Sequence, residues 1–216
     1  MDFIYFKYWE RKNILASKKP HFSTLKWWHS EDLCEVEQVI LSKVESCNAI
    51  LDVGAGDLRV KRKIQNAGFN GEYHTQDIGE EFVYTYKDLD QIDRTYSVIL
   101  CLDVIEHLPV FQGLELIHTL SNLLVTNGVL IIQTPNARCI RNPLISDMTH
   151  LHCYNLSDLW AYLTCMNFDV EGFRVCFEPD KLKFPDNIIS LISKYSITRF
   201  LGLDYSDNII VFATKN

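Results

Sequence analysis

The stretch Ala49-Ile50-Leu51-Asp52-Val53-Gly54-Ala55-Gly56-Asp57 decides the fold. An apolar run ends in an acid and a turn of small residues follows at once, which predicts a buried strand over residues 50–53 that stops sharply. Glycine suits such a turn because it accepts a positive φ and holds no side chain against a ligand. A helix beginning near Leu58 would point its free N–H groups at the space above the strand. The stretch therefore predicts a ligand site at the carboxyl edge of an α/β sheet.

Composition limits the classes of protein to consider. The chain has 216 residues, of which 47% are hydrophobic and 23% charged, as in an ordinary soluble domain. No apolar run approaches the ~20 residues of a membrane span, and the first residues lack the pattern of a signal peptide. Seven cysteines without a Cys-x-x-Cys pair favour reduced thiols and a cytoplasmic protein. A formal net charge of −7 argues against broad nucleic-acid binding.

A second motif follows the apolar run of residues 96–102, which is typical of a parallel strand covered on both faces. The run ends in Asp103-Val104-Ile105-Glu106-His107. Because parallel strands end at one edge of a sheet, both motifs are expected at the same edge.

Together the two motifs resemble those of the class I S-adenosylmethionine-dependent methyltransferases. The first is similar to Asp-x-Gly-x-Gly-x-Gly, with Leu58 where a third glycine is common. The second is similar to the Asp/Glu-x-x-Glu-His of ubiquinone-pathway O-methyltransferases. The resemblance covers residues 50–177 and implies S-adenosyl-L-methionine as cofactor. A nicotinamide fingerprint is not met, because its third glycine would be Arg59.

The alternation of elements predicts one doubly wound, Rossmann-like domain over residues 1–216, with a mostly parallel seven-stranded sheet and an antiparallel last strand. We expect a cap segment at 1–49, a cofactor-binding core at 50–178, a helical insertion at 179–205 and the last strand at 206–216. Ser30 and Ser157 are the expected N-caps of two helices. The expected strands are 49–53, 72–77, 82–86, 96–102, 129–133, 168–177 and 208–214.

The aromatic N-terminal segment, residues 1–29, has two interpretations. It packs over the domain, or it forms a lid that brings Trp27, Trp28 and His29 near the site. The first is favoured.

The resemblance implies which residues surround the cofactor. Asp77, at the end of the second strand, is expected on the ribose hydroxyls, since a carboxylate accepts two hydrogen bonds at once. The adenine is expected against Asp88 and Leu89. The full cofactor set is Asp52, Gly54, Ala55, Gly56, Asp77, Asp88, Leu89 and Leu102.

The acids and histidines that follow the fourth strand have three interpretations. His107 or His150 is a general base for an acceptor hydroxyl, since the pKa of imidazole lies near neutrality. Less favoured, Asp103, Glu106, His107 and His150 bind a divalent cation that lowers the pKa of the hydroxyl. In the third, these side chains only cap a helix and fill a loop. His152 and Tyr154, which share a face with His150 on an extended segment, are expected to line the acceptor pocket.

The sequence therefore predicts O-methylation of a hydroxyl on a small molecule or glycan, with no nucleic-acid partner and no membrane span. One alternative is a metal-dependent RNA 2′-O-methyltransferase. Another is a non-catalytic nucleoside-binding module of the same fold.

Overall fold

The computed structural model describes residues 3–28, 30, 32–45, 47–140, 142–177, 196 and 204–216, without the side chain of Ser146. The predicted insertion at 179–205 falls almost entirely outside these residues, as do His29, Glu31 and Arg141. No helix among the described residues is long and apolar enough to cross a membrane. All seven cysteines are free thiols.

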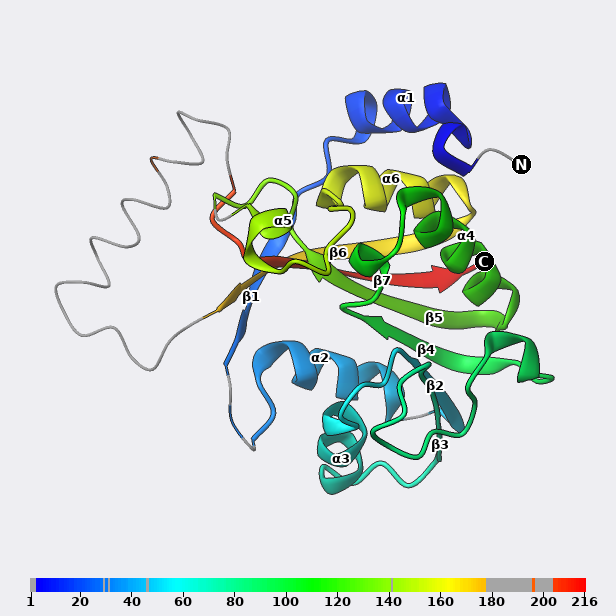
Figure 1. The fold of residues 1–216 in the computed structure, drawn as a ribbon. Coiled ribbons are helices and arrows are strands. Elements are labelled where there is room, and N and C mark those ends of the chain that lie inside the picture. The colour runs from blue at the N-terminus through cyan, green and yellow to red at the C-terminus, as the bar shows by residue number, and fades with distance from the viewer. Residues whose placement is uncertain are drawn as a thin grey trace, which may run out of the picture.

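One sheet organises the described residues (Figure 1). Its strand order is β1-β6-β7-β5-β4-β2-β3, and β7 is antiparallel to both of its neighbours while the other pairs are parallel. This confirms the predicted Rossmann-like class. The strands are β1 (Ser23–Trp27), β2 (Ala49–Val53), β3 (Glu72–Gln76), β4 (Tyr96–Leu102), β5 (Leu124–Pro135), β6 (Phe168–Phe177) and β7 (Asn208–Lys215).

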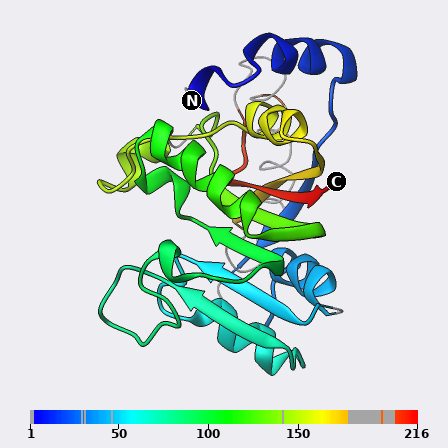
Figure 2. The ribbon, with the colours of Figure 1, turned by 90° about the vertical axis from the view of Figure 1, so that its right-hand side faces the viewer.

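Helices cover both faces of the sheet, as two views at right angles show (Figures 1 and 2). One face carries α4 (Val110–Asn122) and α6 (Leu156–Cys165), and α1 (Tyr8–Lys18) packs on α6. The other face carries α2 (Glu35–Val44) and α3 (Arg59–Asn66). Four short helical segments complete the described elements: the 3₁₀ helices η1 (Phe3–Tyr5), η2 (Leu89–Gln91) and η3 (Ile105–His107), and the single-turn helix α5 (Pro143–Ser146).

The core consists of two apolar clusters, one on each face of the sheet. The central strands explain why: β2 is buried at every position, and β4 is buried at five of seven. Such strands point alternate side chains into both clusters. The sheet is therefore a rigid base whose carboxyl edge carries the loops of interest.

Two strand predictions differ from the structure. Residues 82–86 form no strand, and Tyr86 makes only an isolated bridge to Gln76. Instead, Ser23–Trp27 adds an edge strand beside β6, in register from Ser23↔Phe173 to Trp27↔Phe177. The N-terminal segment is thus part of the sheet as well as packing over it.

Two predicted helix caps are wrong. α2 begins at Glu35, where the Cys34 side chain and Glu37 form a capping box, and not at Ser30. α6 is capped by Asn155, whose side chain accepts the Asp158 N–H, and not by Ser157. In each helix the residue directly before the first turn, and not the predicted serine, accepts a hydrogen bond from a free N–H group of that turn.

Candidate functional site

The turn after β2 is held in a conformation that requires glycine. Gly54 has φ +70° and Gly56 has φ +48°, and a Cβ built on Gly54 would lie 2.3 Å from Cγ2 of Val104. The Gly54 and Ala55 N–H groups both donate to the Gln76 carbonyl, at 2.8 and 3.2 Å. The turn is thereby fixed to the end of β3, with its backbone open toward the carboxyl edge.

Leu58 also has a left-handed backbone, with φ +60°, and it caps α3 without a side-chain hydrogen bond. This is the position where the resembling motif commonly has a third glycine. A non-glycine residue in this region costs roughly 1–2 kcal/mol. Leu58 therefore adopts a backbone conformation that glycine would accept more easily, although the sequence departs from the motif here.

Asp52 lies beneath this turn and is only 3% exposed. Its Oδ2 accepts a 2.9 Å hydrogen bond from the Tyr73 hydroxyl. Burial raises the pKa of the Asp52 carboxyl to about 7, although the Tyr73 hydrogen bond acts in the opposite direction. A cationic group placed above the turn would stabilise the ionised form.

A cavity of about 200 Å³ opens over the glycine turn. Five of the eight residues expected at the cofactor line it: Asp52, Gly54, Ala55, Gly56 and Leu102. The other lining residues, none of which the sequence assigned to the cofactor, are Trp27, Val36, Glu37, Ile40, Asp57, Arg59, Val60, Asp103 and Gln133. Trp27, which the second interpretation of the N-terminal segment brings near the site, stands at the end of the unpredicted strand β1.

The other three expected cofactor residues, Asp77, Asp88 and Leu89, are not among the described lining residues of this cavity. Asp77 accepts the Gly56 N–H on Oδ2 at 2.9 Å and the Gly79 N–H on Oδ1 at 2.7 Å. Asp88 caps η2 through its side chain, and Leu89 begins that turn. Asp77 therefore supports the glycine turn directly.

A buried ion pair joins the two helices beside the cavity. The Lys63 ammonium of α3 lies 3.0 and 2.9 Å from the two carboxylate oxygens of Glu37 in α2, and both side chains are less than 10% exposed. Glu37 Oε2 also accepts the Cys34 N–H at 2.9 Å. Since Glu37 lines the cavity and α3 follows the glycine turn, the pair fixes two of the cavity walls together.

A second cavity, of about 430 Å³, lies at the same edge of the sheet. Its described lining residues are Asp103, Glu106, His107, Pro135, Cys139, Pro143, Asp147, His150, Asp207 and Asn208. Asp103 borders both cavities. Its Oδ2 accepts from Gln133 at 2.8 Å and its Oδ1 from Asn208 at 3.2 Å, so the shared wall is held from two strands.

Glu106 lies at the base of the second cavity and has no exposed surface. Its Oε2 accepts a 3.0 Å hydrogen bond from the Thr134 hydroxyl, while its buried Oε1 has no hydrogen-bond partner. Burial, followed by the nearby Asp103 carboxylate, raises the pKa of Glu106 to about 8. One buried oxygen atom is thus left without a hydrogen-bond donor.

The two predicted catalytic histidines meet at this cavity, with ring centroids 5.0 Å apart. His150 Nδ1 lies 2.9 Å from the Pro143 carbonyl, and His107 Nδ1 lies 3.0 Å from the Thr149 hydroxyl. Because a carbonyl oxygen can only accept, His150 donates from Nδ1 and its Nε2 is free to take a proton when the ring is neutral. The Glu106 carbonyl accepts the Leu151 N–H at 2.7 Å and so fixes the histidine loop to η3.

Three of the four alternative metal ligands come together. Glu106, His107 and His150 each offer one ligand atom within 4.8 Å of the others, whereas Asp103 is not part of this group. A carboxylate and two imidazoles form a donor set that suits a divalent cation, and the unpartnered Glu106 Oε1 is compatible with one.

The structure does not place His152 and Tyr154 among the described residues that line this cavity. Their rings are in contact, with centroids 4.8 Å apart, and burial lowers the pKa of His152. Tyr154 belongs to the hydrophobic core, and its buried hydroxyl has no hydrogen-bond partner. Their expected role in the acceptor pocket gains no support from this geometry.

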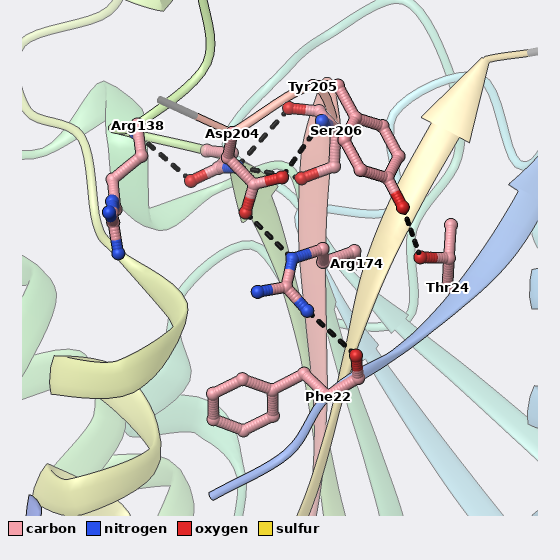
Figure 3. Close-up of polar contacts among 8 residues, drawn as sticks. Phe22, Thr24, Arg138, Arg174, Asp204, Tyr205 and Ser206 are labelled. Atoms are coloured by element: carbon pink, nitrogen blue, oxygen red, sulfur yellow. Dashed lines mark hydrogen bonds and ion pairs between the residues drawn. The ribbon is translucent and has the colours of Figure 1, made fainter. Parts of the chain in front are cut away.

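A polar cluster fixes the segment that leads into β7 (Figure 3). Arg174 donates from Nε to Asp204 Oδ2 at 2.8 Å and from Nη1 to the Phe22 carbonyl at 2.7 Å. Nearby, the Tyr205 and Thr24 hydroxyls are 3.2 Å apart. The cluster joins β1, β6 and the start of β7, which supplies lining residues to the second cavity.

Comparison with known proteins adds to this geometry. A family model described as "Methyltransferase domain" matches residues 27–172. No curated protein sequence matches the chain.

Several solved structures share the fold. A SAM dependent methyltransferase from Archaeoglobus fulgidus is 19% identical, with a TM-score of 0.62 over 83% of this chain and 93% of that one. The plantazolicin methyltransferase BpumL, in complex with SAH, is 18% identical, with a TM-score of 0.54 over 84% and 80%. Magnesium protoporphyrin IX methyltransferase from Synechocystis PCC 6803, with bound SAM, is 15% identical, with a TM-score of 0.54 over 84% and 78%. At these identities the likeness concerns the fold.

Proposed function

This chain belongs to the methyltransferase-domain family, and we propose that it transfers the methyl group of S-adenosyl-L-methionine to a hydroxyl of a small molecule or glycan. The observation that carries the proposal is that Asp103 borders both cavities. One is the cavity over the glycine turn, and the other is the second cavity, which contains Glu106, His107 and His150 and is called the acid–histidine cavity below. A donor in the first and an acceptor in the second would meet at one shared wall.

The cofactor would lie over the glycine turn. Two of the similar structures contain SAM or SAH, which supports the same cofactor here. The buried carboxyl of Asp52 would accept from its ammonium group, and Asp77 remains our candidate for the ribose. The adenine contacts of Asp88 and Leu89 also remain proposals.

Methyl transfer needs an acceptor oxygen in line with the carbon–sulfur bond of the sulfonium. The oxygen attacks the methyl carbon, the carbon–sulfur bond breaks, and the electron pair remains on sulfur. A neutral His107 or His150 takes the hydroxyl proton. The fixed Nδ1 of His150 supports this role, since it leaves Nε2 as the accepting atom.

The first experiment combines a thermal shift with turnover. SAH at 100-fold over its Kd should stabilise the protein by about 2.7 kcal/mol, and acceptor-dependent conversion of SAM to SAH would identify an enzyme. His150→Asn or His107→Asn should lower kcat by ~10²–10⁴, while His21→Asn, an exposed control, should leave it unchanged. Absence of an SAH shift would contradict the proposal, and an SAH shift without turnover would favour a binding module.

A metal-assisted version is favoured by one observation, the grouping of Glu106, His107 and His150. These three residues would hold a divalent cation, which would supply Lewis acidity that lowers the pKa of the acceptor hydroxyl. Turnover that EDTA abolishes and Mg²⁺ or Mn²⁺ restores would establish it. RNA as the acceptor is disfavoured, because four carboxylates line the cavity and phosphates need cationic partners.

We also retain as proposals a single domain over residues 1–216 and a cytoplasmic location. The seven free thiols support a reducing compartment.

A further inference from the structure

The ionisable groups in the described lining of the acid–histidine cavity are mostly acids. It contains four carboxyl groups and two imidazoles and neither Lys nor Arg: the acids are Asp103, Glu106, Asp147 and Asp207. Such a wall attracts a positive charge and repels a carboxylate or phosphate.

Three of these acids already hold donors from the protein. Asp103 accepts from Gln133 and Asn208, and Asp147 Oδ1 accepts from the Thr149 N–H at 2.8 Å and hydroxyl at 2.7 Å. Asp207 Oδ2 accepts from the Phe177 N–H at 3.0 Å. These hydrogen bonds hold the three acids in place around the cavity, and we call them the acidic rim.

Glu106 differs from the rim acids. It is fully buried, and its Oε1 has no hydrogen-bond partner. A buried acceptor without a donor costs free energy that a ligand can recover. The atom therefore indicates a ligand that brings a donor, and the acidic rim indicates that the donor is cationic.

From this arrangement we propose that the methyl acceptor is an amino alcohol, whose protonated amine binds at Glu106 Oε1 while its hydroxyl faces a histidine. The inference rests on the proposed function, because it assigns the acceptor of the same reaction. The amine is a binding group here, and the hydroxyl receives the methyl group.

The spacing suits two functional groups on neighbouring carbons. Ligand atoms of Glu106, His107 and His150 lie within 4.8 Å of one another. Two hydrogen bonds of about 2.8 Å, joined by one amino alcohol unit, can span such a gap. The same three atoms could also surround a divalent cation, and the test below distinguishes the two ligands.

The test uses the smallest matched pair of probes, ethanolamine and ethylene glycol, titrated into protein saturated with SAH and followed by NMR at constant ionic strength. We expect saturable binding of ethanolamine and at least tenfold weaker binding of the glycol. Glu106→Gln should weaken ethanolamine binding by about tenfold or more, as expected for loss of a charge-assisted hydrogen bond. Glu115→Gln, an exposed acid on α4, is the control and should bind like wild type.

Equal binding of the two probes, or no saturable ethanolamine binding by the wild type, would overturn the inference. Ethanolamine binding that requires Mg²⁺ or Mn²⁺ and is lost with EDTA would overturn it in favour of a metal site. The SAH thermal shift is read separately: its loss in the wild type contradicts the methyltransferase proposal, whereas its loss only in Glu106→Gln marks a folding defect. The comparison of the two probes on the wild type is decisive in either case.

Discussion

At the residue scale, substitution of Gly54 tests whether cofactor binding is weakened by backbone strain alone or by a steric clash. Ala at this position would keep φ near +70° and place its Cβ 2.3 Å from Val104, so the glycine turn has to move. We expect Gly54→Ala to weaken SAH binding at least tenfold and to lower the Tm. Gly68→Ala is the matched control, since Gly68 has φ +105° but no atom within 4 Å of its Cβ position. It should cost roughly 1 kcal/mol of stability and leave the Kd unchanged; equal Kd values for both variants would contradict this account of the turn.

Asp52 makes a second residue-scale prediction, on the pH dependence of cofactor affinity. Burial raises the pKa of its carboxyl to about 7, and only the ionised form attracts the ammonium group of the cofactor. The affinity for SAH should therefore rise as the pH increases through about 7 and level off above it. Asp52→Asn, which cannot ionise, should bind weakly with a flat profile. Calorimetric titration over this pH range checks the prediction, and a flat wild-type profile would argue against Asp52 as the partner of the ammonium group.

At the scale of elements, the buried pair Glu37–Lys63 makes the position of α3 depend on α2. Lys63→Met leaves a buried carboxylate without its partner, which typically costs 3–5 kcal/mol. We expect a large loss of stability in urea unfolding and a weaker Kd for SAH. Lys43→Met breaks the exposed pair with Glu171 and should cost at most about 1 kcal/mol. If the two variants were equally stable, the buried pair would not hold the helices in place.

Comparison of the predicted strands with the observed ones shows which elements could be predicted from the sequence. β2 and β4 were predicted correctly because a strand buried on both faces has a continuous apolar run. The error at 82–86 has a physical reason, since Phe82 and Val83 are exposed and apolar residues alone do not make a strand. β1 was missed because an edge strand needs only one partner, and its pairing with β6, 150 positions later in the chain, leaves no local pattern.

Some residues of the candidate site could also be predicted from a local sequence pattern, and others could not. Asp52 and the glycines follow directly from one strand and its turn, so a local pattern was sufficient. Glu37 and Gln133 reach the same cavity from elements whose placement depends on long-range packing. Tyr154 shares its strand-like alternation with His150, yet it packs into the core, where it forms an isolated bridge with Asn136. Which face of a loop meets a cavity is determined by the whole fold.

At the scale of the whole molecule, two buried carboxyls make stability depend on pH. The pKa is raised to about 7 for Asp52 and to about 8 for Glu106, so the folded state binds more protons than the unfolded chain between about pH 4 and 8. The free energy of unfolding should fall as the pH rises across this window, by about 1.4 kcal/mol for each unit of pKa difference.

The double variant Asp52→Asn, Glu106→Gln removes both ionisations and should flatten the decline, so that its Tm exceeds that of the wild type at alkaline pH. Denaturant unfolding at a series of pH values measures the slope directly. Saturating SAH should reduce the decline in the wild type, because its ammonium group compensates the charge of Asp52 while leaving Glu106 unpaired. Wild-type stability that rises with pH across the window would show that these carboxyls are already compensated in the folded protein.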